Sequence, residues 1–434
     1  MLRAGLPSGV TRRTGENFSG GTTVNSEKPK GGGPARDEVL AAATTLGADL
    51  AKTFSERDLR RDFPREEMQK LRRSGLLASS VPAAWGGLDL SFEDIIEIVL
   101  KLAEGNPSVA HMYAEHAIIT KDIIARLPKK ELRDTLYGEI MNGDTYLTAA
   151  GSERNSKHVL AYETTITPVE NGRAVLINGR KFFATGAIDS DFLWVPGVME
   201  GGAASVFVRS KKTPGVTIFD DWDAIGMQGT WSGSVEFKDA RVPMEFVVPA
   251  ATDPRTLDPE QLFGPMFQTA FTAISLGPAK AAFEHAVDYV KTKTRPWVGG
   301  GVTAATNDPY ILREIGRMSS YLAAAEGMVR EAARSIEHAC QLRGQSRPDA
   351  QMAARLEAMA KVAQAKVVTT DVALEVTTNV FKVCGARAAL RDENMDRFLR
   401  DVRTITLHDP VEWKARLVGE YVLHGTYEYV PFLT

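Results

Sequence analysis

His408 and Asp409, within RDVRTITLHDPVEWK at 400–414, are the residues whose types could most directly carry chemistry. A histidine beside a carboxylate could be a catalytic pair, since an imidazole gains and loses a proton near neutral pH. The same letters also describe a helix entrance, with Asp409 as N-cap, Pro410 as first helical residue and Glu412 as capping-box partner. A proline pushes the preceding residue toward the extended geometry of an N-cap. We therefore expect Asp409 to cap a helix.

His408 would then lie just outside the N-terminus of that helix. The positive end of the helix dipole disfavours an imidazolium by some tenths of a kcal/mol to about 1 kcal/mol. A neutral His408 that donates one hydrogen bond is therefore expected, and the same field favours a developing anion nearby. On local evidence alone, a lone histidine such as His408 is more often a core residue or a satisfied surface residue.

Composition narrows the class of protein. The chain has 434 residues, of which 44% are apolar and 25% charged, enough for two or three domains with large cores. Its 52 basic and 55 acidic residues give a net charge of −3, so nothing draws the whole chain toward nucleic acid or an anionic membrane. No window approaches about 18 uninterrupted apolar residues, so we expect no membrane span.

Cysteine usage and the first residues indicate the compartment. Cys340 and Cys384 are the only cysteines, which excludes a disulfide framework or a cysteine-rich metal site and suits a reducing cytoplasm. Arg12 and Arg13 resemble the start of a twin-arginine signal, yet Gly, Ser, Thr and Asn follow instead of an apolar run. We expect a cytoplasmic protein without a metal ion, and a disordered tail at 1–35.

Three successive sequence patterns along the chain predict three domains, which would position the site. From 36 to 145, apolar residues at helical spacing, as in FEDIIEIVLKLAEG, predict a helical domain. From 146 to 250, short β-rich runs such as RAVLINGRKFFA predict a small antiparallel sheet or barrel. From 251 to 434, long Ala-rich amphipathic stretches predict a helical bundle. The expected fold is mainly α with a central β domain.

Several motifs in this order resemble the acyl-CoA dehydrogenase superfamily. They are FPREEMQKLRRSGLLASSVPAAWGG from Phe63, GRKFFATG at 179–186, GMQGTWSGSVEFKDARVP at 226–243 and KVCGARAALRDENMDRFLRD at 382–401. Independent matches in the right order are more specific than one glycine motif. The resemblance covers residue 36 to the end and implies an acyl-CoA dehydrogenase-like fold: an N-terminal helical domain, a middle antiparallel β domain and a C-terminal four-helix bundle.

The resemblance implies a flavin between the β domain and the bundle, and a homotetramer. Thr148 and Thr185 fall where the superfamily hydrogen-bonds the isoalloxazine, and Phe183 falls where an aromatic packs against the ring. Gly385 resembles the turn that approaches the nucleotide end of the cofactor. Without the resemblance, Phe183 could be a core strand residue, Thr185 a β-former and Gly385 a helix-terminating glycine.

Departures from the dehydrogenase pattern indicate a different chemistry. Where the dehydrogenases carry a Thr-Glu-Pro-Gly-Ala-Gly-Ser-Asp type run, LTAAGSERNSKH at 147–158 retains the Thr but has Ala149, Ala150 and Arg154 at the Glu, Pro and Ser positions. Ungapped alignment places Asp409 where the dehydrogenases have their catalytic glutamate. Aspartate is one methylene shorter, and a misplacement of about 1 Å can cost on the order of a hundredfold in rate. We therefore expect the dehydrogenase base to be absent.

The pattern Arg-Thr-x-Thr-x-His-Asp-Pro at 403–410 resembles the two-component flavin monooxygenases typified by dibenzothiophene monooxygenase and its alkylsulfone-handling relatives. TRPW at 294–297 also fits this branch, and we expect its Arg295 to bind the cofactor. The resemblance implies that a separate NAD(P)H-dependent flavin reductase supplies reduced flavin, with FMN expected and FAD the alternative. O2 then forms a C4a-hydroperoxyflavin, which oxygenates a small organic substrate; sulfur compounds are candidates.

A hydroperoxyflavin lasts only where water is excluded and where hydrogen-bond donors hold the distal oxygen of its peroxide group. His408 is the first expected donor and Thr185, near the flavin N5, the second. His116, in YAEHAII, is expected to orient substrate or return a proton, although it could equally be a histidine at a helix seam. Phe183, Trp194 and Trp231 are candidates for an aromatic wall that excludes water, although single tryptophans are more often core residues.

Other functions stay open at this stage. One is an acyl-CoA dehydrogenase-type flavoprotein that oxidises a CH–CH bond with an unconventional base. Another is a non-catalytic scaffold that binds no flavin. A third is a nitroalkane oxidase or an amino-sugar N-hydroxylase, because the same fold hosts these chemistries.

Overall fold

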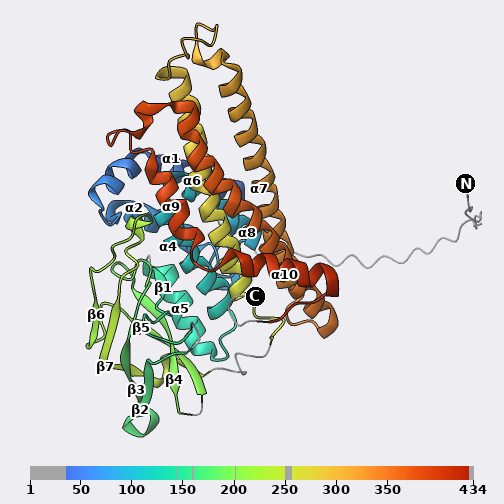
Figure 1. Cartoon of the computed structure of the whole chain (residues 1–434). Coiled ribbons are helices and arrows are strands. Elements are labelled where there is room, and N and C mark those ends of the chain that lie inside the picture. Colours follow the sequence, from blue (N-terminus) through green and yellow to red (C-terminus); the bar gives the residue numbers. More distant parts are fainter. Residues whose placement is uncertain (1–35, 144, 159–160, 201, 250–256, 430–434) are drawn as a thin grey trace, which may run out of the picture. The chain divides into compact units, whose positions relative to one another are not determined.

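The structure, a computed structural model, describes residues 36–143, 145–158, 161–200, 202–249 and 257–429. The tail predicted at 1–35 lies outside the described residues. All described residues belong to one packed unit that spans 34–434, and Figure 1 shows its strands gathered beside the helices. Across the described ranges, no helix combines the length and the apolar character that a membrane span requires.

Helices form the first part of the described chain. They are α1 (Arg36–Arg60), α2 (Arg65–Arg73), α3 (Phe92–Gly105), α4 (Pro107–Ile118) and α5 (Lys130–Gly143), with a π-helical turn at Ile119–Ile124. The Asn106 side chain caps α4 by accepting from Ser108 N and Val109 N, and Pro107 takes the first helical position. Every residue of α4 is buried, because this helix packs against α3, α6 and β1.

One sheet follows. Its strands are β1 (Leu147–Ala149), β2 (Thr165–Val169), β3 (Ala174–Lys181), β4 (Phe192–Met199), β5 (Gly202–Arg209), β6 (Val216–Ile218), β7 (Val235–Pro243) and β8 (Val247–Pro249). The strand order is β6-β7-β3-β2-β4-β5-β8, and β1 pairs with β4. Most pairs are antiparallel, as predicted, but β1 and β2 each pair with β4 in parallel. The parallel pairing sets Thr148 beside Leu193.

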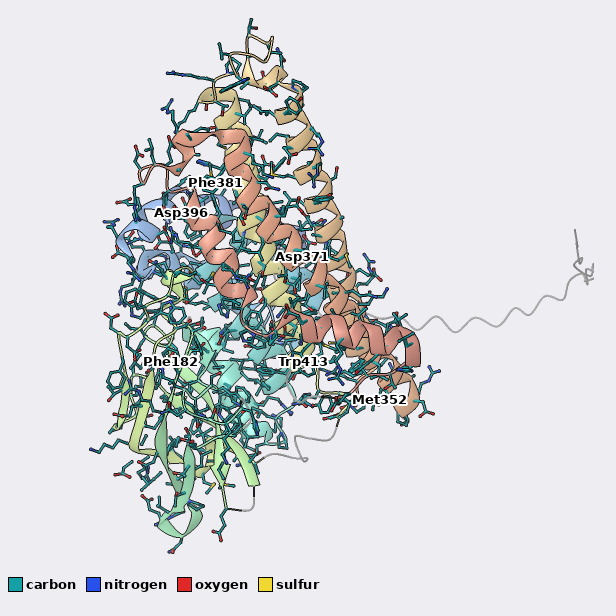
Figure 2. All side chains as sticks on the ribbon, in the orientation of Figure 1. Phe182, Met352, Asp371, Phe381, Asp396 and Trp413 are labelled. Carbon is teal, nitrogen blue, oxygen red and sulfur yellow. The ribbon has the colours of Figure 1, made fainter. Side chains whose placement is uncertain are left out.

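Long helices form the last part. They are α6 (Phe263–Thr292), α7 (Pro309–Gln341), α8 (Pro348–Cys384), α9 (Asp396–Thr406) and α10 (Val411–His424). Helices α6, α7 and α8 pack against one another, α9 lies on α6 and α8, and α10 lies on α8. Figure 2 shows Phe381 and Asp396 toward one end of these helices and Met352 and Trp413 toward the other.

The predicted class, mainly α with a central β-sheet, is confirmed by these elements. The limits predicted for the domains, 36–145, 146–250 and 251–434, stay a prediction. The feature that matters for the site is that α4, β1, α6 and the turn between α9 and α10 meet around the same side chains.

Candidate active site

His408 lies in the short turn between α9 and α10. Its ring packs against Phe271 of α6, with ring centroids 4.1 Å apart. Phe271 also meets His111 of α4 edge-on, at 5.2 Å. One phenyl ring therefore contacts two imidazoles that come from distant parts of the chain. The His408 side chain is 45% exposed, so a bound molecule can reach it.

Asp409 does not cap α10, and this prediction is wrong. The helix begins at Val411, the residue before it is Pro410, and no side chain caps it. The Asp409 carboxylate instead pairs with Lys366 of α8 and, at 3.0 Å, with Lys414 of α10. Its Oδ1 also lies 3.4 Å from His408 Nδ1. Two buried cations outcompete the backbone N–H groups of the helix end, because an unpaired buried charge is far more costly than an unpaired amide.

The charges in this cluster are strongly perturbed. Burial alone would raise the pKa of Asp409, but the hydrogen bond from His408 and the two ammonium groups lower it well below its usual range. Burial lowers the pKa of Lys366 to about 8, although Asp409 opposes the shift. Desolvation lowers the pKa of His408, and Lys366 adds to this effect while Asp409 opposes it. At neutral pH, Asp409 is ionised and His408 is uncharged.

Thr148, on β1, is tied to α4 and to the loop after β3. Its Oγ1 lies 2.6 Å from the carbonyl oxygen of Thr185 and 2.7 Å from Glu115 Oε2. A hydroxyl has one proton, and a carbonyl cannot donate, so the Thr148 proton goes to Thr185. The contact to Glu115 then requires a proton on the carboxyl group. Burial indeed raises the pKa of Glu115 to about 7, so this acid keeps its proton to a much higher pH than an exposed glutamate.

The hydroxyl of Thr185 belongs to a row of hydroxyl groups. Thr230 donates to the carbonyl oxygen of Met227 at 2.7 Å, and Ser232 donates to Thr230 at 2.8 Å. Thr185 Oγ1 lies 3.0 Å from Ser232 Oγ. Because the Ser232 proton is already committed, Thr185 donates to Ser232 and keeps its lone pairs as acceptors. The predicted role of Thr185 as a donor stays a prediction, and the order of protons favours an acceptor.

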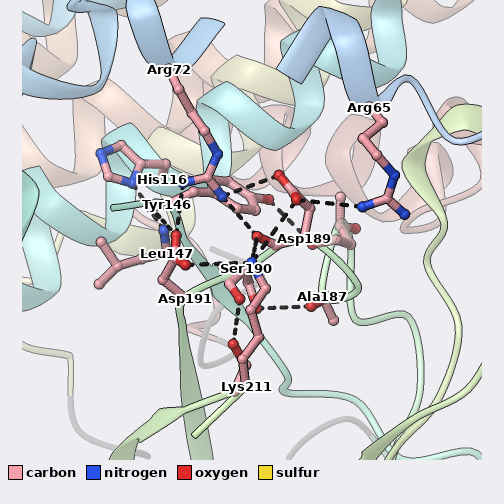
Figure 3. Close-up of polar contacts among 12 residues, drawn as sticks. Arg65, Arg72, His116, Tyr146, Leu147, Ala187, Asp189, Ser190, Asp191 and Lys211 are labelled. Atoms are coloured by element: carbon pink, nitrogen blue, oxygen red, sulfur yellow. Dashed lines mark hydrogen bonds and ion pairs between the residues drawn. The ribbon is translucent and has the colours of Figure 1, made fainter. Parts of the chain in front are cut away.

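His116 lies in a different network from His408 (Figure 3). Its Nδ1 accepts from Leu147 N at 3.1 Å, and its Nε2 lies 2.8 Å from the Leu77 carbonyl oxygen. Both ring nitrogens are therefore used by backbone groups, and burial lowers the pKa of His116 to about 4. Its predicted role toward substrate stays a prediction; what the structure brings to Phe271 and His408 is His111, five positions earlier.

The same network fixes the start of β1. Asp191 accepts from Tyr146 N at 3.0 Å and from Arg72 at 2.8 Å. Figure 3 shows Arg72 reaching from α2 to Asp189 and Asp191. Glu115 Oε2 accepts from Ala149 N at 3.0 Å. Thus Thr148 is held by bonds to the residues on either side of it.

Aromatic side chains on one face of α6 extend the site toward the sheet. Phe263, Phe267 and Phe271 follow one another at i, i+4 spacing, with centroids 4.6 and 5.6 Å apart. Trp194 of β4 meets Phe263 at 5.3 Å. Within the described residues, Trp194 Nε1 and His111 Nδ1 are buried and have no hydrogen-bond partner. An apolar wall with a few unsatisfied polar groups is the usual make-up of a small-molecule site.

The other wall candidates lie elsewhere. Phe183 has a φ of 57°, uncommon for a bulky residue, and its ring is 57% exposed beside Trp222. Trp231 packs edge-on against Phe63. Phe183 thus presents an aromatic face that a flat ring can cover, close to Thr185 in the chain. These groups, with the open lone pairs of Thr185, fit a flavin.

Gly385 and Arg295 belong to other elements: Gly385 follows the end of α8, and Arg295 lies in the loop after α6. Both are exposed, and their neighbours Val383 and Thr294 are hydrogen-bonded at 3.4 Å. Gly385 has a φ of 79°, a conformation that favours glycine. At 1.5 Å per residue, it lies about 28 Å along α8 from Lys366. Among the described residues, no hydrogen bond or ring contact joins Gly385 or Arg295 to Thr148, Thr185 or Phe183.

Sequence reasoning missed Glu115, His111, Lys366 and Lys414. His111 and Glu115 stand four positions apart, so a helix places them on one face, and this spacing was available. Lys366 interrupts an otherwise apolar and small stretch, VAQAKVVTT, which is a signal for a paired buried lysine. Nothing local indicates its partner, which lies 43 positions away.

Comparison with protein families gives matches along most of the chain. Residues 36–144 match the family model described as acyl-CoA dehydrogenase, N-terminal domain. Residues 148–240 match the middle domain and residues 269–413 the C-terminal domain of the same family.

Individual relatives point to one branch. Dibenzothiophene monooxygenase of Rhodococcus qingshengii is 35% identical over 402 residues, which cover 91% of this chain and 95% of that protein. A protein of Pseudomonas putida named probable FMNH2-dependent monooxygenase SfnC is 29% identical, covering 89% and 95%. FMN-bound TdsC from Paenibacillus sp. A11-2 superposes with a TM-score of 0.85 at 32% identity, covering 92% of this chain and 100% of that one.

These matches confirm the acyl-CoA dehydrogenase-like fold, and they favour the monooxygenase branch over the dehydrogenase alternative. The pairing of Asp409 agrees with them, because two lysines hold the carboxylate that stands at the position of the dehydrogenase base. The chain belongs to the acyl-CoA dehydrogenase superfamily and, within it, to the flavin-dependent monooxygenases.

Proposed function

We propose that this chain is the oxygenase component of a two-component system. It takes reduced FMN from a separate NAD(P)H-dependent flavin reductase and uses O2 to oxygenate a small organic sulfur compound. Support comes from the names of its relatives, which include dibenzothiophene monooxygenase, an FMNH2-dependent monooxygenase and methanesulfinate monooxygenase MsuC of Pseudomonas fluorescens. The observation that carries the proposal is the pair of uncharged imidazoles, His111 and His408, which both contact the phenyl ring of Phe271.

The residues that hold the cofactor in this proposal are Thr148, Thr185 and Phe183. Thr185 offers lone pairs to a ring N–H, and Phe183 covers a ring face. When bound, reduced flavin supplies the electrons that activate O2. The chain's own contribution is to exclude water along Trp194 and the α6 phenylalanines and to handle protons at His408.

His111 takes the second histidine role that the sequence suggested for His116. Burial lowers the pKa of His111 to about 3, so it acts as a neutral group. Its Nδ1 has no partner within the described part of the chain, and its Nε2 lies 3.5 Å from Glu115 Oε1. A substrate atom at Nδ1 would be oriented by this ring.

We propose that the protein forms a homotetramer in which Gly385 and Arg295 bind the cofactor of a neighbouring subunit. Within the described residues, no hydrogen bond or ring contact ties them to Thr148, Thr185 or Phe183, so we assign them to the cofactor of a neighbouring copy. Exposed apolar residues on the last helices, including Trp413, Val422 and Leu423, supply surface that such an assembly would cover. The proposed location is the cytoplasm, in keeping with the two free cysteines.

Rapid mixing tests the proposed chemistry. FMN-loaded, photoreduced protein is mixed with oxygenated buffer, and we expect a transient absorbance before the oxidised flavin spectrum returns. His408→Ala is expected to abolish the transient. His424→Ala, an exposed histidine at the end of α10, is the matched control and is expected to keep it.

Incorporation of 18O from 18O2 into the product measures oxygen transfer itself. Incubation with a flavin reductase, NADH, FMN, 18O2 and a panel of sulfides, sulfones and sulfinates is expected to place one labelled oxygen atom in a sulfur-containing product. Single-step reoxidation of the wild type together with no labelled product contradicts the proposal. Bleaching of the oxidised flavin by an acyl-CoA without oxygen would instead support a dehydrogenase.

A further inference from the structure

Beneath His408 lies a buried ion cluster. The side chains of Asp409, Lys366 and Lys414 are each 4 to 5% exposed. Gln268 of α6 accepts from Lys366 at 2.6 Å and is itself buried. Two ammonium groups thus pair with one carboxylate next to His408. Buried charges are costly unless they are paired, so the two lysines hold the Asp409 carboxylate in its ionised form.

The carboxylate determines which nitrogen of His408 carries the proton. Asp409 is ionised between its two lysines and can therefore only accept hydrogen bonds. Its Oδ1 lies 3.4 Å from Nδ1 of His408, so that nitrogen has to be the donor. Within the described residues, Nε2 has no partner. A neutral imidazole with its proton on Nδ1 presents a lone pair at Nε2.

We propose that Asp409 and Lys366 are positioning residues: Asp409 fixes His408 as the Nδ1-protonated tautomer, and Lys366, with Lys414, keeps the ring uncharged. The Nε2 atom of His408 can then accept a proton from a molecule bound in the site. The sequence predicted a donor at this position. The proton-accepting role rests on the proposed function, whereas the tautomer does not.

The charges around His408 agree with this assignment. From α8 and α10 it faces the ammonium groups of Lys366 and Lys414, and from its own turn the carboxylate of Asp409. From α4 it faces His111, which burial keeps uncharged, and from α6 the Phe271 ring. Protonation of His408 would place a further positive charge beside the two ammonium groups. Removing Lys366 leaves Asp409 and Lys414 as a neutral pair, so the imidazolium becomes easier to form.

The test is histidine-selective 15N NMR on the full chain without flavin. Protonated and lone-pair-bearing ring nitrogens resonate far apart, and the His408 signals are those lost in His408→Gln. We expect Nδ1 to be protonated and Nε2 to bear the lone pair in the wild type. Lys366→Met is expected to raise the protonated fraction of His408 at a given mildly acidic pH by roughly tenfold, the effect of one nearby charge.

Controls separate this effect from a general loss of packing. Lys382→Met removes an exposed lysine from the same helix and is expected to leave the His408 titration unchanged. Lys366→Arg keeps the charge and is expected to restore the wild-type titration. Asp409→Asn is expected to remove the preference for the Nδ1 tautomer.

Two results would overturn the proposal. One is an Nε2-protonated tautomer in the wild type, which needs no variant and so decides the matter even if Lys366→Met does not fold. The other is an equal His408 titration in Lys366→Met and Lys382→Met. Because no flavin is present, failure of the proposed oxygenase chemistry leaves these measurements intact, and the two failures can be told apart.

Discussion

Replacing Asp409 by asparagine removes the only carboxylate of the described residues that pairs with Lys366 and Lys414. At about 3 Å and an effective dielectric constant of about 20, each pair is worth about 5 kcal/mol of Coulomb energy. An asparagine oxygen still accepts one hydrogen bond, so part of this is retained. Breaking a buried ion pair from one side typically costs about 3–5 kcal/mol. We expect Asp409→Asn to lower the free energy of unfolding by that amount at pH 7.

The stability cost of Asp409→Asn is expected to decrease as the pH rises. In the folded protein, the pKa of Lys366 is lowered to about 8 by burial, and loss of the carboxylate that opposes the shift lowers it further. A lysine whose pKa is lower in the folded state makes stability rise with pH, from the folded pKa up to the unfolded value near 10.4. In Asp409→Asn this rise begins at a lower pH than in the wild type, so the cost of the substitution should shrink as the pH rises toward about 8 and should change little above it, where Lys366 is neutral in both folded proteins.

Urea unfolding at pH 7 and at about pH 9.5, at one protein concentration, measures this. Glu420→Gln, which breaks an exposed pair with Arg416, is the control and should change little at either pH. A loss below about 1 kcal/mol at pH 7 for Asp409→Asn, or a loss that grows with pH, would refute the reasoning about the cluster.

Three further changes follow from the site. Glu115, with its pKa raised to about 7, makes stability fall as the pH rises from about 4.5 through 7. Glu115→Gln should remove this dependence, which is about 2.5 kcal/mol between pH 5 and 8 in urea unfolding, and should abolish an infrared band of a protonated carboxyl group. Persistence of both in the variant would count against a neutral acid at this position. Phe271→Ala should cost about 3–5 kcal/mol of unfolding free energy, because it empties a buried position, and a cost under 1 kcal/mol would mean that the ring is not packed as described. Phe183→Ala, at an exposed position, should leave the thermal midpoint nearly unchanged but weaken FMN binding in a fluorescence titration; unchanged affinity would remove Phe183 from the flavin site.

The fold could be predicted from the sequence because each domain repeats a local pattern many times. Helical spacing in FEDIIEIVLKLAEG and short β-rich runs such as RAVLINGRKFFA correspond to α3 and β3. The parallel pairing of β1 with β4 was not accessible, since it joins Thr148 to a strand some 45 positions later in the chain. Pairing over such a distance is set by packing and leaves no local signature.

The residues of the site could be predicted from the sequence only in part. Its central residue, His408, was found, but its neighbour was given a local role that D-P-V-E describes equally well. The choice of His116 over His111 has a similar cause. Helix α4 is buried all round, so no polar stripe shows which face meets the site. Contacts from α6 and β1 decide this, and they join residues that are far apart in the sequence.

The position of Phe271 limits how the enzyme can be adapted to other molecules. Since this one ring supports His111 and His408 at once, a change in its size would disturb both imidazoles together. Room for a bulkier guest has to come from Phe267, Phe263 or Trp194, farther along the same aromatic wall. A library that varies these three while leaving Phe271 alone would change the aromatic wall and keep the ring that supports both imidazoles.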